Sequence, residues 1–180
     1  MNIRLEPCKK ADYETLEAIY LTAFPKNERS PFSMLVKKAE KGKGDFLTVK
    51  DGGGIIGMAY TVCGGSAAYL FYLAIADDKR GRGCGTAVLS ALKERYRGRK
   101  LFLARERLDE PCDNLEQRIK RRDFYLANGF SDQNGHIKEG RVTYDIMSIG
   151  GPVTADDYRQ LMVQWSGRLF VRLMGIKITD

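Results

Sequence analysis

Residues 69–96, YLFYLAIADDKRGRGCGTAVLSALKERY, contain an apolar run, a glycine-rich basic loop and a segment with a helical pattern, in that order. The loop residues that could bind a ligand are Arg80, Gly81, Arg82, Gly83 and Gly85. Free N–H groups and the dipole at a helix N-terminus attract anions. Glycines allow the backbone to approach closely, and arginines add charge-assisted donors. The stretch therefore predicts a phosphate or pyrophosphate site.

Two familiar phosphate loops do not fit this stretch. A P-loop requires GxxxxGK[ST], and the chain contains neither Gly-Lys-Ser nor Gly-Lys-Thr. A dinucleotide fingerprint requires GxGxxG, but its third glycine position holds Thr86 or Val88, depending on where the motif starts. Glu106 lies about 20 residues downstream, where a ribose-binding acid would be expected. However, a meander of antiparallel strands is expected before this stretch, and the chain contains a single βαβ unit. Both features make a dinucleotide-binding fold the weaker interpretation.

A third pattern, Arg/Gln-x-x-Gly-x-Gly/Ala, is filled by Arg80-Gly81-Arg82-Gly83-Cys84-Gly85. The pattern follows the strand-like LAIADD and opens the helical TAVLSALKERY, and FYLANGF occurs further on at residues 124–130. With these features the sequence resembles the GNAT (GCN5-related N-acetyltransferase) family. The resemblance covers approximately residues 3–149 and leaves the C-terminal segment outside it.

The resemblance implies transfer of an acetyl group from acetyl-coenzyme A, as cosubstrate, to an amine. By the family pattern, the amides of Gly81 through Thr86 would hold the pyrophosphate and the strand before them would line the pantetheine arm. A backbone N–H near Ile75 would face the thioester oxygen. The residues assigned to the coenzyme are Leu73, Ala74, Ile75, Arg80, Gly81, Arg82, Gly83, Cys84, Gly85 and Thr86.

The resemblance also suggests catalytic residues. Tyr125 matches the family's frequent general acid, which gives a proton to the leaving thiolate. Many relatives carry a carboxylate where this chain has Ala104, two positions before Glu106. Glu106 therefore remains a candidate base, with a plain salt bridge to an arginine as the alternative. Glu28, in the loop after the first helix, is the other candidate base.

Cysteine and histidine usage indicates no metal site. Four cysteines lie far apart without a CxxC pair, and His136 is the single histidine. This pattern argues against structural zinc and against a disulfide scaffold, and it is typical of reduced thiols in a cytoplasmic protein. We expect Cys84 to be a small apolar filler and His136 to be a surface residue in a turn-rich segment.

The apolar patterning predicts an α/β (α+β mixed) fold in a single domain, residues 1–180, with a mixed, twisted sheet of about seven strands and flanking helices. An additional helix over residues 154–175 lies outside the family core. Strands are expected near residues 3–7, 45–50, 55–63, 68–76, 100–106, 130–138 and 141–149. Helices are expected at 11–24, 33–42, 86–96 and 114–128.

The formal net charge is +7, but no nucleic-acid module is recognisable. We interpret the basic run 118–122 as a solvated helix face and expect neither a nucleic-acid nor a membrane partner. We expect no signal peptide, and no apolar run in the sequence reaches the length needed to span a membrane. The C-terminal helix is apolar enough to pack on its own sheet, to form a homodimer contact, or to lie on a membrane surface through its arginines.

Three functions follow from these observations. The first is an N-acetyltransferase acting on a small-molecule amine or a peptide amine by direct attack in a ternary complex. The alternative is a non-catalytic module that binds and senses acyl-coenzyme A, which the missing carboxylate at Ala104 favours. A basic nucleic-acid binder would leave the FYLANGF motif unexplained.

Overall fold

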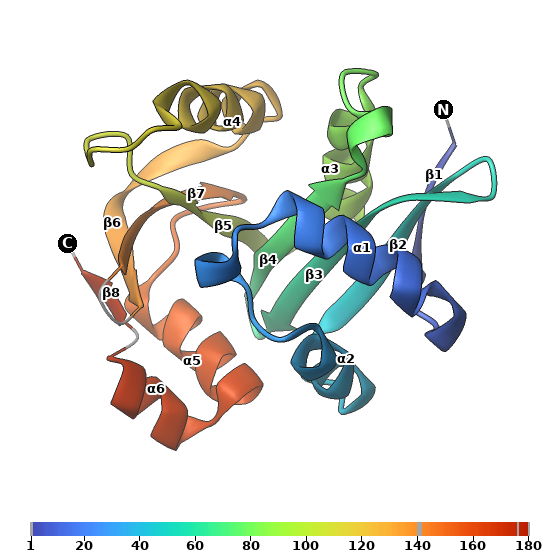
Figure 1. The fold of residues 1–180 in the computed structure, drawn as a ribbon. Coiled ribbons are helices and arrows are strands. Elements are labelled where there is room, and N and C mark those ends of the chain that lie inside the picture. The colour runs from blue at the N-terminus through green and yellow to red at the C-terminus, as the bar shows by residue number, and fades with distance from the viewer. Residues whose placement is uncertain (1, 140–141, 176, 180) are drawn as a thin grey trace. The chain divides into compact units, whose positions relative to one another are not determined.

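The computed structural model describes residues 2–139, 142–175 and 177–179, and the chain divides into two compact units (Figure 1). Unit 1 comprises residues 1–62 and 70–97, and unit 2 comprises residues 63–69 and 98–180. Strand β4, Ala67–Ile75, begins in unit 2 and continues into unit 1. The glycine-rich loop that follows β4 therefore belongs to unit 1.

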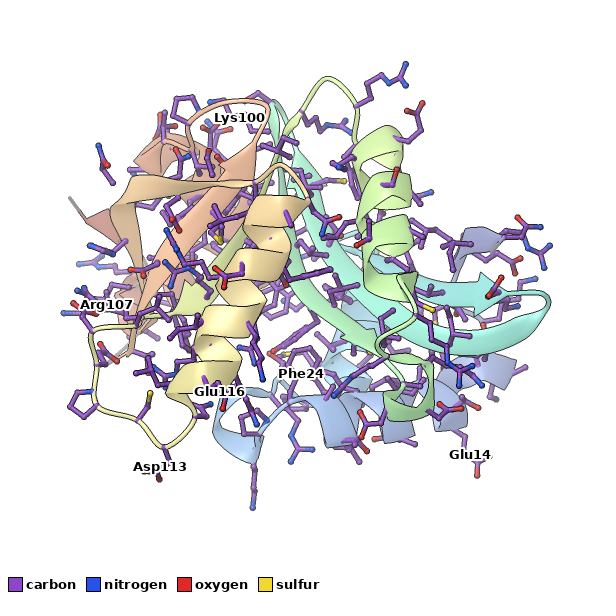
Figure 2. The ribbon with its side chains drawn as sticks, turned by 90° about the horizontal axis from the view of Figure 1, so that it is seen from above. Glu14, Phe24, Lys100, Arg107, Asp113 and Glu116 are labelled. Carbon is purple, nitrogen blue, oxygen red and sulfur yellow. The ribbon has the colours of Figure 1, made fainter. Side chains whose placement is uncertain are left out.

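Unit 1 holds four adjacent strands in the order β1-β2-β3-β4, and its pairs β1/β2 and β2/β3 are antiparallel. Its other elements are β1 Ile3–Pro7, α1 Tyr13–Ala23, α2 Phe32–Glu40, β2 Asp45–Asp51, β3 Gly54–Gly64 and α3 Cys84–Arg95. Helices α1 and α2 cover one face of these strands and α3 covers the other (Figures 1 and 2). The predicted meander and helices of this unit are confirmed.

Aromatic side chains fill much of the core of unit 1. Tyr20 of α1 and Tyr60 of β3 are almost fully buried. Tyr72 of β4 packs edge-on against Tyr20, with ring centroids 5.0 Å apart, and against Phe24 at 4.9 Å. Such edge-to-face pairs stabilise a core beyond the area they bury. They fix the end of α1 against the strand that leads into the glycine-rich loop.

Unit 2 contains the strand order β4-β5-β7-β6-β8. The pairing of β4 with β5 is parallel and covers Ala67–Tyr69, whereas the other pairs of this unit are antiparallel. Its elements after β4 are β5 Lys100–Glu106, α4 Leu115–Ala127, β6 Ser131–Glu139, β7 Val142–Ile149, α5 Ala155–Ser166, α6 Arg168–Met174 and β8 Lys177–Thr179. Residue 141, the expected start of the last predicted strand, lies outside the described residues.

The two faces of the unit 2 strands bind different helices. Alternation along β5 sends Phe102 and Arg105 to opposite sides. Phe102 packs near Tyr158 of α5, with ring centroids 6.3 Å apart. Arg105 binds Asp132, which Arg122 of α4 also contacts. Helix α5 therefore packs on the face that carries Phe102, and α4 lies over the face that carries Arg105.

The C-terminal segment departs from the prediction of one helix. Gly167, at φ 91° and ψ 154°, separates α5 from α6, because a residue in this conformation cannot continue an α-helix. Helix α5 begins with a capping box, since the Thr154 side chain accepts from the Asp157 amide and the Asp157 side chain accepts from the Thr154 amide. Strand β8 adds an eighth strand in the described part of the chain to the roughly seven predicted.

Packing differs between the two C-terminal helices. In α5, Leu161, Met162 and Trp165 are buried. In α6, Leu169 and Leu173 are 71% and 75% exposed. The prediction that this segment packs on its own sheet thus holds for α5. None of the helices in the described residues is both long and apolar enough to cross a membrane.

Candidate active site

The loop between β4 and α3 presents consecutive backbone N–H groups from Gly81 to Thr86. Within the described residues none of these groups donates to a protein acceptor, and the first bonded amide is that of Ala87, 3.1 Å from the Gly83 oxygen. Unpaired, parallel N–H groups at a helix start form an anion-binding concavity. The residues present therefore fit a phosphate group.

Glycine is required for this loop conformation. Gly81 and Gly83 have φ values of 74° and 77°, in the left-handed region that other residues rarely adopt. Gly83 is the N-cap residue that directly precedes helix α3. Space surrounds both glycines, since an added Cβ would meet no atom within 4 Å. Their role is thus to orient the loop amides rather than to relieve crowding.

The two loop arginines differ in their contacts. Arg80 donates from Nε to the Ile75 carbonyl at 3.0 Å and forms an ion pair with Asp77 at 2.9 Å. Arg82 is exposed and has no ion pair within the described part of the chain. Arg80 therefore fastens the loop to β4, and Arg82 is the arginine with a guanidinium available to a ligand.

The end of β4 approaches β3 unusually closely. Leu73 and Ile75 are partly exposed, whereas Ala74 is 3% exposed. A Cβ built on Gly57 of β3 would lie 2.3 Å from the Ala74 oxygen and 3.0 Å from the Ile75 Cδ1 atom. Only glycine fits there, so Gly57 sets the position of the strand segment that sequence analysis assigns to the coenzyme.

Tyr72 attaches the loop containing Glu28 to the same strand. Its hydroxyl donates to the Glu28 carbonyl at 3.1 Å and accepts from the Ser30 amide at 3.1 Å. Tyr20 donates to the Ser30 carbonyl at 3.0 Å. The loop backbone around Glu28 is thereby held to β4.

In unit 2, the other two predicted catalytic residues share a neighbour. Glu106, the last residue of β5, forms an ion pair with Arg121 of α4. Tyr125 lies one turn further along α4. Burial raises the pKa of the Tyr125 hydroxyl to about 12, with the Arg121 charge lowering it and the Glu106 charge raising it. The structure thus brings Glu106, Arg121 and Tyr125 together.

The basic run of α4 is largely exposed, as expected of a solvated helix face, but three of its arginines have partners on other elements. Arg118 donates to the Arg107 carbonyl at 2.7 Å, and Arg122 donates to Asp132 at 2.9 Å. Arg107 lies on the loop that leads from β5 into α4 (Figure 2). Every residue of α4, all of which are described, keeps part of its surface exposed, and ionic contacts add to the ring contact that Tyr125 makes with Phe130. The sequence shows the arginines but not their distant acidic partners.

His136 also lies in a different setting from the one predicted. It belongs to strand β6 rather than to a turn, and its Nδ1 lies 3.0 Å from an Asp145 oxygen. The same carboxylate binds the buried Arg105 at 2.9 Å. Strand pairing places Asp145 opposite both His136 and Arg105. This network is a structural feature that periodicity alone does not reveal.

The remaining predicted loop and motif residues occupy structural positions. Cys84 is 5% exposed at the start of α3, as expected of a small apolar filler. Gly129, at φ 86°, ends α4, and Phe130 is 3% exposed with its ring 5.7 Å from that of Tyr125. Within the described residues, no group of acidic, cysteine and histidine side chains is arranged to hold a metal ion.

Comparison with known proteins identifies the class. The family model described as Acetyltransferase (GNAT) domain matches residues 33–132, more than half of the chain. No curated protein matches the sequence. The chain belongs to the GNAT acetyltransferase family, and the predicted family and fold class are confirmed.

Solved structures share this fold. A GNAT-family protein from Bacteroides thetaiotaomicron matches with a TM-score of 0.75 and 22% identity, over 97% of this chain and 99% of its own. An aminoglycoside 6'-N-acetyltransferase complexed with coenzyme A matches with a TM-score of 0.63 and 14% identity, over 85% and 100%. The protein yncA of Salmonella typhimurium, solved with acetyl-CoA, matches with a TM-score of 0.59 and 16% identity, over 85% and 99%.

Proposed function

We propose that the protein is an acetyl-coenzyme A-dependent N-acetyltransferase whose acceptor, a primary amine, attacks directly while both substrates are bound. The observation that carries this proposal is the run of unpaired amides from Gly81 to Thr86. These N–H groups and the Arg82 side chain would hold the pyrophosphate. When bound, the coenzyme supplies an acetyl group activated as a thioester.

The end of β4 would bind the pantetheine arm. Backbone groups of Leu73, Ala74 and Ile75 would pair with its amides, and the partial exposure of Leu73 and Ile75 leaves apolar surface for it. The N–H near Ile75 would stabilise negative charge developing on the thioester oxygen. Family membership and the coenzyme-bound matches support these assignments.

Tyr125 is the proposed general acid. A phenol whose pKa is raised to about 12 by burial stays protonated at neutral pH and can donate to the sulfur as the C–S bond breaks. The phenolate then recovers a proton from solvent, which balances the proton that the amine loses.

Glu28 is the proposed base. The carboxylate of Glu106 is already engaged in an ion pair with Arg121. The backbone at Glu28 is held by Tyr72 to the strand assigned to the coenzyme. Replacing Glu28 with Gln should lower turnover at pH 7 while leaving coenzyme affinity intact, and the loss should shrink at higher pH, where more amine is already neutral. A pH-independent loss would contradict this role.

Thermal melting with acetyl-CoA, and with NAD and ATP as controls, tests the proposal directly. A ligand bound only by the folded protein raises the midpoint. A rise with acetyl-CoA alone is expected, and Gly83→Val should abolish it. The matched control is Gly42→Val, because Gly42 also has a positive φ, 65°, with no atom within 4 Å of an added Cβ. No rise with acetyl-CoA would refute the function.

A second function, sensing of acyl-coenzyme A without turnover, is favoured by one observation. Ala104 replaces a carboxylate, and the next acidic side chain on β5, Glu106, is engaged by Arg121. Thiol release measured with an aminoglycoside, a polyamine, amino acids and a peptide amine separates the two functions. Binding of acetyl-CoA without release in any mixture would favour the sensor.

A further inference from the structure

The junction between β5 and α4 is held by side chains from one face of the helix. Arg118, Arg121 and Tyr125 have the i, i+3, i+7 spacing that places residues on the same side of a helix. Arg118 binds the Arg107 carbonyl and also donates to the Asn114 side chain at 2.9 Å. Arg121 binds Glu106. The helix face that carries Tyr125 is therefore fixed to the end of β5.

Glu106 lies within electrostatic reach of the Tyr125 hydroxyl, and so does Arg121. The Glu106 side chain is 13% exposed, so little water competes for its oxygens. Within the described residues the Tyr125 hydroxyl makes no hydrogen bond. A neighbouring carboxylate is the acceptor that a phenol prefers, since charge-assisted bonds are the strong ones. The guanidinium of Arg121 occupies that acceptor.

We propose that Arg121 is a positioning residue for acetyl transfer: by engaging Glu106, it keeps the Tyr125 proton available to the leaving sulfur. The inference rests on the proposed role of Tyr125 as the acid. Without Arg121, the phenol donates to Glu106 and turns away from the sulfur. In a variant that lacks both Arg121 and Glu106, no neighbouring carboxylate remains to accept a hydrogen bond from the Tyr125 hydroxyl. Glu106 thereby acts as the counter-ion of Arg121 and not as the base.

The kinetic test compares Arg121→Gln, Glu106→Gln and the double variant with a control on the same helix. Lys120→Gln is the control, because Lys120 pairs with the exposed Glu116 at 2.6 Å on a different face. Turnover is measured with acetyl-CoA and the best amine of the panel. Arg121→Gln should lower kcat about 10-fold or more, a fraction of the 100-fold or larger contribution of a general acid. The KM for acetyl-CoA should not change.

Rescue is the decisive kinetic result. The double variant should turn over faster than Arg121→Gln, because the competing carboxylate is gone. A double variant no faster than Arg121→Gln, or an Arg121→Gln enzyme as fast as Lys120→Gln, overturns the inference. If Glu106→Gln is slower than Arg121→Gln, Glu106 is the base and the inference also falls. Melting with acetyl-CoA on every variant shows whether the coenzyme site itself has failed.

A second readout needs no substrate. With tyrosine labelled at ¹³Cζ, Tyr125→Phe identifies the Tyr125 resonance in the free protein. In Arg121→Gln the resonance should be displaced from its wild-type position, because the phenol now donates a hydrogen bond to the Glu106 carboxylate. In the double variant it should return toward the wild-type position. A wild-type-like resonance in Arg121→Gln refutes the positioning role even if the enzyme is an acetyltransferase.

Discussion

Replacement of Gly57 by Ala tests whether the close approach of β3 and β4 sets the position of the strand that we propose binds the coenzyme. The added Cβ would lie 2.3 Å from the Ala74 oxygen, whereas ordinary contact begins at 3.4 Å, so the strands must separate by about 1 Å. Overpacking of this kind costs about 1–3 kcal/mol, partly offset by about 0.4–1 kcal/mol from the lower entropy of the unfolded chain. We therefore expect a net loss of about 1–2 kcal/mol.

Two assays measure this change. Thermal melting should show a midpoint lower by about 2–8 °C for a chain of this size. Calorimetric titration with acetyl-CoA should show affinity reduced about tenfold, because 1.4 kcal/mol of misplacement corresponds to a factor of ten. The matched control is Gly54→Ala in the same strand, where an added Cβ would meet only the Asp51 oxygen, at 3.8 Å.

The control should melt and bind within error of the wild type. A Gly57→Ala protein with full affinity for acetyl-CoA would refute the reasoning, because the position of Ala74 and Ile75 would then not matter to the coenzyme. Lower stability with unchanged affinity would show that Gly57 serves only the packing of unit 1.

Three further predictions concern other side chains. Tyr125→Phe should bind acetyl-CoA normally but lower kcat by about 10²–10⁴-fold, and unchanged turnover at every pH would exclude the acid role. Tyr72→Phe should release the loop backbone at Glu28, raise the KM for the amine and cost about 1–2 kcal/mol in urea unfolding; an unchanged KM would count against the loop's role. Asp157→Asn should cost about 1.5–3 kcal/mol at pH 7, because Asp157 loses its charge beside Lys100, 2.8 Å away. Burial opposes ionisation of Asp157, but hydrogen bonds from Lys100, Thr154 and Ser66 outweigh this effect and lower its pKa. The wild type should therefore lose this stability as the pH falls below 3.8, the ordinary pKa of an aspartate, whereas the variant has no such stability to lose. If the free energy of unfolding depends on pH in the same way in both proteins between pH 5 and pH 2, that assignment is contradicted.

Local sequence signals predicted most of the fold. Strand periodicity and glycine turns located β2, β3 and β4, and helical spacing with Gly129 located α4. The division of the C-terminal segment into two helices was missed because Gly167 lies inside a continuous apolar pattern, and a single glycine is tolerated in many helices. Strand β8 is three residues long, too short to show a period.

The candidate site was predictable only where a motif is contiguous. The glycine-rich loop and Tyr125 follow from short stretches of sequence. The partners of Arg118, Arg121 and Arg122 do not, because each lies on a different element and is brought close only by folding. Gly57 was missed for the same reason: its need for glycine comes from the carbonyl of Ala74, on the neighbouring strand.

The unpaired amides of Gly81 to Thr86 bear on how the rate of acetyl transfer should depend on pH. Backbone N–H groups do not titrate, so the proposed phosphate binding through them would be constant over the pH range in which an acceptor amine changes charge. They are also independent of side-chain identity, so substitutions at Arg82 would tune affinity without removing the donors. A pH–rate profile of this enzyme would accordingly report proton transfer and the acceptor rather than coenzyme capture.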